Sequence, residues 1–395
     1  MANDILITPD IAAAYFLCKR KAFLLLRGEQ SQTAHPYVVL KEDHAAAILR
    51  TFLDSSNRAG LSVQHCNGAA PAGKANVFAH ASLRADDLQA TADALVVLEK
   101  PSGKGQPPYE PHLAIGSHSI ANEDKIRLAF TGHILGNGYR QRPETGVIIN
   151  AAGDVQRINL TKLIASLESA IDTLKAWKAA PATAPPPILL NDHCPICPFR
   201  TKCLEQAEKD DSLTLLDRMT QKVMRKYHKK GIFTITQLSY LFQPRRQRKK
   251  RKDRPAGFSL ELQALALRTD KIYLHNTPDI PQKSTELYLD MEGIPDHGSH
   301  YLIGVVIRSE GKEQSHSFWA DSSKEEKSIL EQFVALATRH HDAPIYHYGS
   351  YEPKALVRMA KASGVDVEAI VSRLVNVNTF VFGKVYFPAR SNTLK

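Results

Sequence analysis

The chain has few cysteines, no long apolar run and no leader-like segment. Five cysteines in 395 residues exclude the dense disulfide framework of a small secreted protein. No stretch reaches about 18 apolar residues, so the sequence predicts no membrane-spanning helix and no membrane partner. The opening Met-Ala-Asn-Asp-Ile lacks the basic and apolar blocks of a signal peptide. Together these absences predict a cytoplasmic protein.

The charge balance is strongly basic. The formal net charge is +10 and the isoelectric point is near 9.2, which favours a polyanionic partner. Simple solubility is the alternative explanation, and the distribution of the charge along the chain separates the two.

Three of the five cysteines lie within ten residues of one another. Cys194, Cys197 and Cys203 form a C-x2-C-x5-C pattern on a proline-stiffened loop, and Cys18 lies far upstream. Four thiolates can bind zinc or an iron–sulfur cluster, and free thiols are the third alternative. A zinc ribbon would more often show a second C-x2-C pair, which is absent from the sequence. Cys66 fits no part of the pattern.

One early cysteine followed by a closing C-x2-C-x5-C resembles the iron–sulfur RecB-like nucleases. The resemblance implies an α/β, restriction-endonuclease-like nuclease domain over residues 1–205. It also implies a [4Fe–4S] cluster held by one set of ligands: Cys18, Cys194, Cys197 and Cys203. The cluster would then hold the end of the domain against its first helix, expected from Thr8 through Lys21.

The same resemblance implies a PD-(D/E)xK site, in which an Asp and a (D/E)-x-K triplet on neighbouring strands surround Mg²⁺ or Mn²⁺. On the expected strands 92–99 and 109–115, Asp93 and Glu110 match the two acids, but His112 stands where lysine belongs. Lys125, on the next helix, is a candidate migrated lysine, and His44 matches the histidine that these nucleases place beside the metal. Three interpretations stay open: an active site using Asp93, Glu110 and Lys125, a weakened site, or an inactive fold kept for DNA binding.

Residues 206–283 form a basic middle segment. A helix expected over residues 213–230, a glycine turn and the sequence GIFTITQL resemble half of a helix-hairpin-helix element, which holds phosphate through backbone N–H groups. A run of basic residues follows and is either a flexible linker, a DNA-contacting arm acting through counterion release, or both. The candidate nucleic-acid-binding residues are Lys229, Lys230, Arg245, Arg246, Arg248, Lys249, Lys250 and Arg251.

Residues 284–395 begin with the strand sequence ELYLDMEG. Asp290 and Glu292 are two apart, so they share one face of that strand and can point at one metal ion. Together with the strands and helix that follow, this series resembles an RNase H-like, DEDD-type 3′–5′ exonuclease. In it, Glu352 is the candidate acid of the second motif. The third motif is absent before Lys395, so we expect this domain to be truncated.

The sequence therefore predicts a metal-dependent DNA nuclease in which both candidate sites look incomplete, and two rival functions stay open. The nuclease would be exonucleolytic and act in DNA repair, recombination or mobile-element defence. The first rival is a nucleic-acid-binding scaffold with two degenerate nuclease folds that recruits a helicase or another partner. The second is a zinc-binding regulator.

Overall fold

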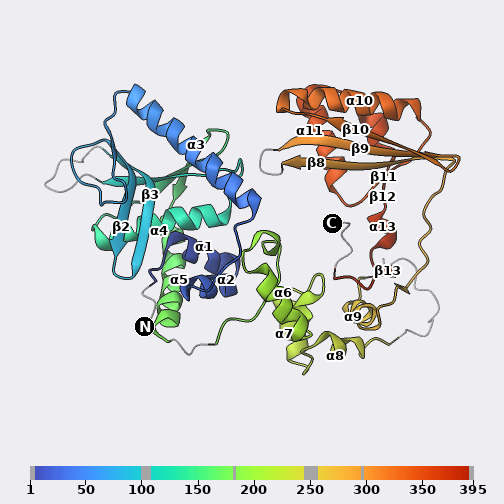
Figure 1. Ribbon diagram of the computed structural model, residues 1–395, viewed down its shortest axis with the longest axis horizontal. Helices are drawn as coiled ribbons and strands as arrows, with labels where there is room; N and C mark the ends of the chain where they lie inside the picture. Colours follow the sequence, from blue (N-terminus) through green and yellow to red (C-terminus); the bar gives the residue numbers. More distant parts are fainter. Residues whose placement is uncertain (1–4, 99–107, 181–183, 244–256, 295–297, 391–395) are drawn as a thin grey trace. The chain divides into compact units, whose positions relative to one another are not determined.

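The computed structural model describes residues 5–98, 108–180, 184–243, 257–294 and 298–390. The chain divides into two compact units, Met1–Gln206 and Ala207–Lys395, drawn in Figure 1. Among the described residues, no helix is both long and apolar enough to cross a membrane.

The first unit is built on a six-stranded mixed sheet in the order β1-β2-β3-β4-β5-β6. β1 is parallel to β2, β4 is parallel to β5, and the other neighbours are antiparallel. Its elements are α1 (Pro9–Leu17), α2 (Lys19–Leu26), α3 (Pro36–Arg58), β1 (Val63–His65), β2 (Val77–Ala85), β3 (Leu88–Val97), β4 (Tyr109–Ala114), α4 (Asn122–Gly138), β5 (Thr145–Ile149), β6 (Val155–Asn159), α5 (Thr161–Ala179), the 3₁₀ turn η1 (Cys194–Ile196) and α6 (Arg200–Lys209).

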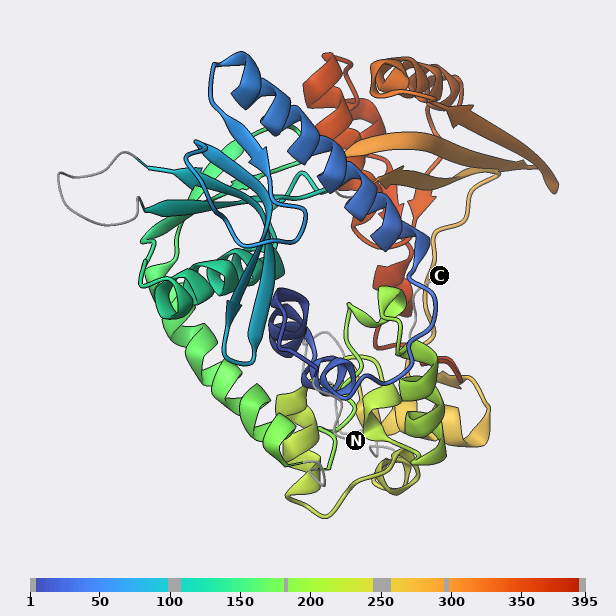
Figure 2. The same cartoon turned by 60° about the vertical axis from the view of Figure 1, so that its left-hand side comes forward.

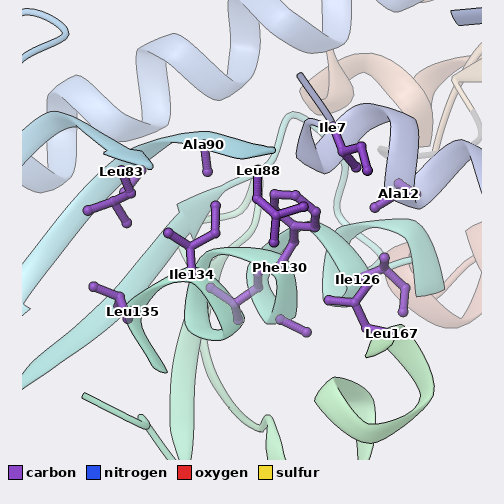
Figure 3. Close-up of a cluster of buried hydrophobic side chains, with 14 of the residues drawn as sticks. Ile7, Ala12, Leu83, Leu88, Ala90, Ile126, Phe130, Ile134, Leu135 and Leu167 are labelled. Atoms are coloured by element: carbon purple, nitrogen blue, oxygen red, sulfur yellow. The ribbon is translucent and has the colours of Figure 1, made fainter. Parts of the chain in front are cut away.

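Helices cover both faces of this sheet. Leu49 and Leu53 of α3 pack against buried residues of β2, β3 and β4, and α4 packs on the opposite side, as Figure 2 shows. Figure 3 shows Phe130 and Ile134 of α4 beside Leu88 of β3, within one core of fully buried side chains. Burial of this apolar surface is the main stabilising contribution to the unit.

The helix expected from Thr8 through Lys21 is interrupted, so this prediction was wrong in its extent. Thr8 caps α1 as expected, because its hydroxyl accepts a hydrogen bond from the Ile11 N–H at 3.4 Å. Cys18, however, has extended backbone angles (φ −156°, ψ 108°) and separates α1 from α2. The break places Cys18 at the junction of two helices rather than on the side of one.

The second unit contains a five-stranded sheet in the order β10-β9-β8-β11-β12. β8, β9 and β10 are antiparallel, whereas β11 is parallel to β8 and β12. Its elements are the 3₁₀ turn η2 (Leu213–Leu215), α7 (Gln221–His228), α8 (Ile235–Ser239), α9 (Leu260–Thr269), β7 (Tyr273–Leu274), β8 (Thr285–Ile294), β9 (Ser299–Ser309), β10 (Lys312–Trp319), the 3₁₀ turn η3 (Ser323–Glu325), α10 (Glu326–Arg339), β11 (Ile345–His347), α11 (Tyr351–Ser363), α12 (Glu368–Val371), β12 (Leu374–Asn376), α13 (Asn378–Val381) and β13 (Val385–Tyr386).

One face of the five-stranded sheet carries the core. Leu287, Leu289 and Met291 of β8 are buried against apolar side chains of α10 and α11. Because side chains alternate along a strand, the other face of β8 carries Tyr288, Asp290 and Glu292. The acids therefore lie on the face that α10 and α11 leave uncovered.

The first helix of the middle segment is shorter than the sequence predicted. The helix predicted over residues 213–230 begins only at Gln221, because Thr220 caps it through a hydrogen bond from the Val223 N–H at 3.3 Å. Residues 385–389 pack on this segment: β13 pairs with β7, and the Gln263 amide donates to the carbonyl oxygens of Phe387 and Ala389 at 2.9 and 2.7 Å.

His300 of β9 is a buried histidine that lies between two charged side chains. The side chain is 1% exposed, and Arg358 of α11 lies 2.9 Å from its Nε2 atom. Glu326 of α10 lies 3.6 Å from Nδ1. Burial first, and the Arg358 charge second, lower the pKa of His300 to about 4.

We expect acid to weaken this unit through His300. Between the folded value and the unfolded value of about 6.5, only the unfolded state binds the proton, so the stabilisation is complete above about pH 6.5 and is lost as the pH falls toward 4. The loss is about 3 kcal/mol in the free energy of unfolding. Urea unfolding from pH 7 to pH 4 should show a flatter profile for His300→Gln, whereas parallel profiles for the two proteins would contradict the assignment.

Candidate functional site

Asp290 and Glu292 lie on the open face of β8, next to a gap in the side chains of β9. Asp290 is exposed and Glu292 is half-buried. The residue paired with Asp290 on β9 is Gly304, and the one paired with Glu292 is Leu302. Residues paired directly across antiparallel strands share a face, so the missing side chain at Gly304 leaves the Asp290 carboxylate accessible from the β9 side.

Glu352 comes to the same end of β8 from the first turn of α11. It is 5% exposed, and its Oε2 atom lies 3.4 Å from Nδ1 of His347, the last residue of β11. Among the described groups neither of these two atoms has a hydrogen-bond partner. A buried carboxylate oxygen in this state is costly, which fits a group that binds a ligand from outside the chain.

Tyr351 joins the acids of the two elements. Both Glu292 and Glu352 act on its hydroxyl and help to raise its pKa, after the larger effect of burial. A side chain at Gly293 would collide with the Tyr351 hydroxyl, because a Cβ atom there would lie 2.6 Å from it. Such a Cβ atom would also lie 2.5 Å from the Ser299 carbonyl oxygen of β9, so the glycine after Glu292 leaves room for both the β9 backbone and α11.

The donor set fits a hard divalent cation only in part. Carboxylate oxygens are the ligands that Mg²⁺ and Mn²⁺ prefer, and Mg²⁺ usually keeps waters and substrate phosphates as further ligands. Within the part of the chain that the structure describes, no three His, Cys, Asp or Glu side chains form a group that could hold a metal ion. Asp290 and Glu292 would thus hold such an ion together with ligands from the substrate and solvent.

The first unit has a cavity of about 590 Å³, and Asp93 is one of the residues that line it. The Asp93 Oδ2 atom accepts a hydrogen bond from the Ala114 N–H of the neighbouring strand at 2.9 Å. Burial raises the pKa of Asp93, against smaller opposing effects of this hydrogen bond and of His80 and Arg127. His80 and Arg127 also line the cavity, so the acid has basic side chains close to it.

The other three predicted residues of this site do not line the cavity. Glu110 is 4% exposed and accepts hydrogen bonds from Arg157 at 3.0 and 3.2 Å and from the Thr145 hydroxyl at 2.7 Å. Lys125 and His44 are absent from the lining, where Arg127 and Glu42 are found instead. The structure therefore places Asp93 and His112 in the lining of one cavity. Glu110, 3.4 Å from His112 Nε2, and Lys125 and His44 are outside that lining.

Arg127 and Glu42 were missed by the sequence reasoning. Arg127 lies two residues after Lys125 on α4, and an ion pair joins it to Asp10 at 3.0 Å. Positions two apart on a helix point in different directions, so the cation that faces the cavity could be chosen only once the rotation of α4 was known. Tyr351 was missed as well, although it stands directly before Glu352 in the sequence.

The four predicted cluster cysteines surround one small cavity. It has a volume of about 20 Å³ and its lining includes Cys18, Cys194, Cys197 and Cys203. Burial and the other three cysteines raise the pKa of Cys203 to about 11, with burial the larger cause and Arg20 opposing it. Cys66 is buried in the apolar core of the first unit.

Several contacts hold the cysteine loop against the junction of α1 and α2. The Asn191 side chain donates to the Leu17 carbonyl oxygen at 3.1 Å, and Arg20 donates to the Pro186 carbonyl oxygen at 3.0 Å. Lys21 lies 2.9 Å from Nε2 of His193. The loop and the first helices thus form one structure around the cavity, with two basic side chains beside it.

The predicted nucleic-acid-binding residues are only partly described. Lys229 and Lys230 are exposed and follow directly after α7, with Gly231 in the left-handed conformation at φ 74°. The run from Arg245 to Arg251 lies outside the described residues. The ring of the exposed Phe233 lies 5.1 Å from the ring of His228 between centres, tilted by 35°, so an aromatic side chain accompanies the basic ones.

Comparison with known proteins identifies one part of the chain. A family model described as the RNase_H superfamily matches residues 287–389, which run from β8 to β13 and include Asp290, Glu292 and Glu352. No curated protein matches the chain. The second unit thus contains an RNase H-like domain, and a domain of this kind indicates nuclease-like activity on nucleic acid, usually with Mg²⁺ or Mn²⁺.

Proposed function

We propose that the protein is a metal-dependent DNA nuclease whose chemistry takes place at Asp290, Glu292 and Glu352. The observation that carries the proposal is the pair of acids on the open face of β8, inside the region matched by the family model. A Mg²⁺ or Mn²⁺ ion held there would activate water and stabilise charge on the phosphate. The chain itself supplies the carboxylates, and Tyr351 fixes α11 beside Glu292.

The net charge supports a nucleic acid as the substrate. A chain with formal charge +10 attracts polyanions, and Lys229 and Lys230 are exposed cations of the same unit. Exonucleolytic cleavage, a role in DNA repair, recombination or mobile-element defence, and a helicase as partner are the finer parts of this proposal. They rest on the resemblance of the sequence to the two nuclease families.

We also propose a [4Fe–4S] cluster bound by the four cysteines that surround the small cavity. Each thiolate of such a cluster binds a different iron, so the ligands surround a volume rather than meet at one ion. The sequence has no second C-x2-C pair of the kind that a zinc ribbon would more often show, which favours a cluster over zinc. Arg20 and Lys21 lie beside the cavity and would compensate the negative charge of a thiolate-bound cluster.

A second candidate function is supported by the first unit. Glu110 is engaged by Arg157 and Thr145, and Lys125 does not reach the cavity that holds Asp93. A site without its second acid and lysine lacks the groups that bind metal and position water. In this reading the first unit binds nucleic acid as a scaffold, and cleavage belongs to the second unit alone.

The test is a nuclease assay on the full chain. Anaerobically purified protein is incubated with single-stranded and duplex DNA in Mn²⁺, with EDTA as the control. Cleavage that needs the metal supports the nuclease proposal. Folded protein that binds DNA but cleaves neither substrate would contradict it and leave the scaffold function.

Asp93→Ala is expected to leave this cleavage close to that of the unaltered protein. The reason is that Asp93 shares its cavity with neither Glu110 nor Lys125. The rate of DNA cleavage in Mn²⁺ is compared for Asp93→Ala and for Asp54→Ala, an exposed acid on α3. A loss of about a hundredfold in Asp93→Ala alone would place the chemistry in the first unit.

A further inference from the structure

The open face of the RNase H-like sheet carries a row of three residues across three strands. Glu292 of β8 pairs with Leu302 of β9, and Leu302 pairs with Trp319 of β10. Directly paired residues share a face, so Trp319 lies on the same face as Glu292. Neighbouring strands are about 4.8 Å apart, which places Trp319 about 10 Å from Glu292 along the row.

The row ends in an exposed aromatic surface. The Trp319 side chain is 61% exposed, although tryptophan usually buries most of its large apolar area. Its ring stacks on Tyr301 with ring centres 5.8 Å apart and planes at 24°. One side of the indole is thus supported by the protein, and much of its remaining surface is open.

An irregularity in β9 brings Tyr301 to this position. Glu292 pairs with Leu302, but the next residue, Gly293, pairs with His300, so Tyr301 is an extra residue in β9. A bulge of this kind redirects a side chain and is frequent beside active sites. Without it, strand alternation would point Tyr301 and Leu302 to opposite faces, and the ring could not support Trp319.

We propose that Trp319, supported by Tyr301, stacks on an unpaired base of the nucleic acid that enters the Asp290–Glu292 site. This inference rests on the proposed function, because it takes a nucleic acid as the substrate. An exposed, supported indole offers a flat apolar surface to any base, independent of sequence. The bases inside a duplex are already stacked on one another, so the surface selects single-stranded substrate.

The distance from Trp319 to the acids agrees with this role. At a stacked spacing of about 3.4 Å per nucleotide, a separation of about 10 Å corresponds to roughly three nucleotides. Gly304, in the neighbouring row opposite Asp290, leaves room for the backbone between them. The base on Trp319 would therefore belong to the same strand as the phosphate at the acids.

The chain contains two tryptophans, which gives a direct measurement of stacking. Trp177 packs between Tyr15 and Phe23, with ring centres 5.6 Å away in both pairs. In a Trp177→Phe variant, Trp319 is the only fluorescent indole. The fluorescence of this variant is titrated with oligo(dT) and with a blunt duplex in EDTA, so that no cleavage occurs, and binding is followed in parallel by polarisation of a labelled oligonucleotide.

Oligo(dT) is expected to quench Trp319 in a saturable way, and the blunt duplex to quench it much less. Trp319→Phe, which keeps Trp177 as its only indole, should show no such change. Unchanged Trp319 fluorescence, or an equal response to the duplex, would overturn the inference. So would a fluorescence change that follows protein concentration without DNA, because the indole would then contact a second copy of the chain.

Cleavage kinetics provide a second readout. Trp319→Ala should raise KM for single-stranded DNA by about tenfold with little change in kcat. Val357→Ala, which removes an exposed apolar side chain from α11, is the matched control. If the unaltered protein cleaves nothing, the proposed function fails, whereas the quenching result still decides whether the base-stacking surface exists.

Discussion

Replacing Asp290 with alanine is expected to lower the rate of Mn²⁺-dependent DNA cleavage by about a thousandfold or more. Asp290 is exposed on the uncovered face of β8 and is paired with a glycine on β9. A carboxylate in this position has no packing role, so its removal should affect metal binding and leave the fold intact. The rate is measured on single-stranded DNA under saturating metal.

Asp321→Ala is the matched control for this variant. Asp321 is an exposed acid of the same domain, two residues after Trp319, which is the last residue of β10. It is outside the rows of the open face.

 Circular dichroism of both variants confirms that each is folded before the rates are compared. Equal rates for Asp290→Ala and the unaltered protein would remove the second unit as the site of cleavage. Equal losses in both variants would point to a general effect of charge on DNA binding.

Replacing Cys203 with alanine is expected to abolish the brown colour and the absorption at about 400 nm that the proposed cluster would give to anaerobically purified protein. Cys203 lines the same cavity as the other three cysteines, and a cluster that loses one thiolate loses one of its four links to the chain. Because the cavity lies between the cysteine loop and the α1–α2 junction, loss of the cluster should also lower the thermal midpoint of the first unit.

Cys66→Ala separates the cluster from a general effect of thiol loss. Cys66 is 8% exposed in the apolar core and belongs to no part of the cysteine loop. It should therefore keep the full absorption and iron content. Colourless protein that binds about one zinc per chain, measured by elemental analysis, would replace the cluster with a structural zinc site.

Local patterns in the sequence predicted most of the elements that surround the sites. The strand with Asp290 and Glu292 was expected because alternating apolar residues define its buried face, and the structure confirms β8 over Thr285–Ile294. The interruption at Cys18 was not expected, since α1 and α2 both consist of good helix formers. In the structure the cysteine loop is hydrogen-bonded to residues on both sides of this break.

Two features of the sites could not be predicted from the sequence because they depend on contacts between residues far apart in the chain. Glu110 looked like a metal ligand from its position near Asp93, but the residues that engage it, Thr145 and Arg157, lie 35 and 47 positions further along the chain. No local sequence pattern indicates such a distant hydrogen-bond partner. The bulge at Tyr301 is similar, because an extra residue in a strand becomes visible only when the register of its neighbour is known.

The attachment of the chain's last strand has a consequence for how the second unit can be divided. Tyr386 of β13 is 1% exposed, packs with Leu262 and Ala266 of α9, and accepts a hydrogen bond from the Ser259 N–H at 2.8 Å. A fragment beginning near residue 284 would keep Tyr386 but lose Ser259, Leu262 and Ala266, which contact it. The helices before the RNase H-like sheet and the sheet itself should therefore open as one cooperative unit in hydrogen exchange. A fragment that keeps the RNase H-like domain folded should accordingly begin before α9.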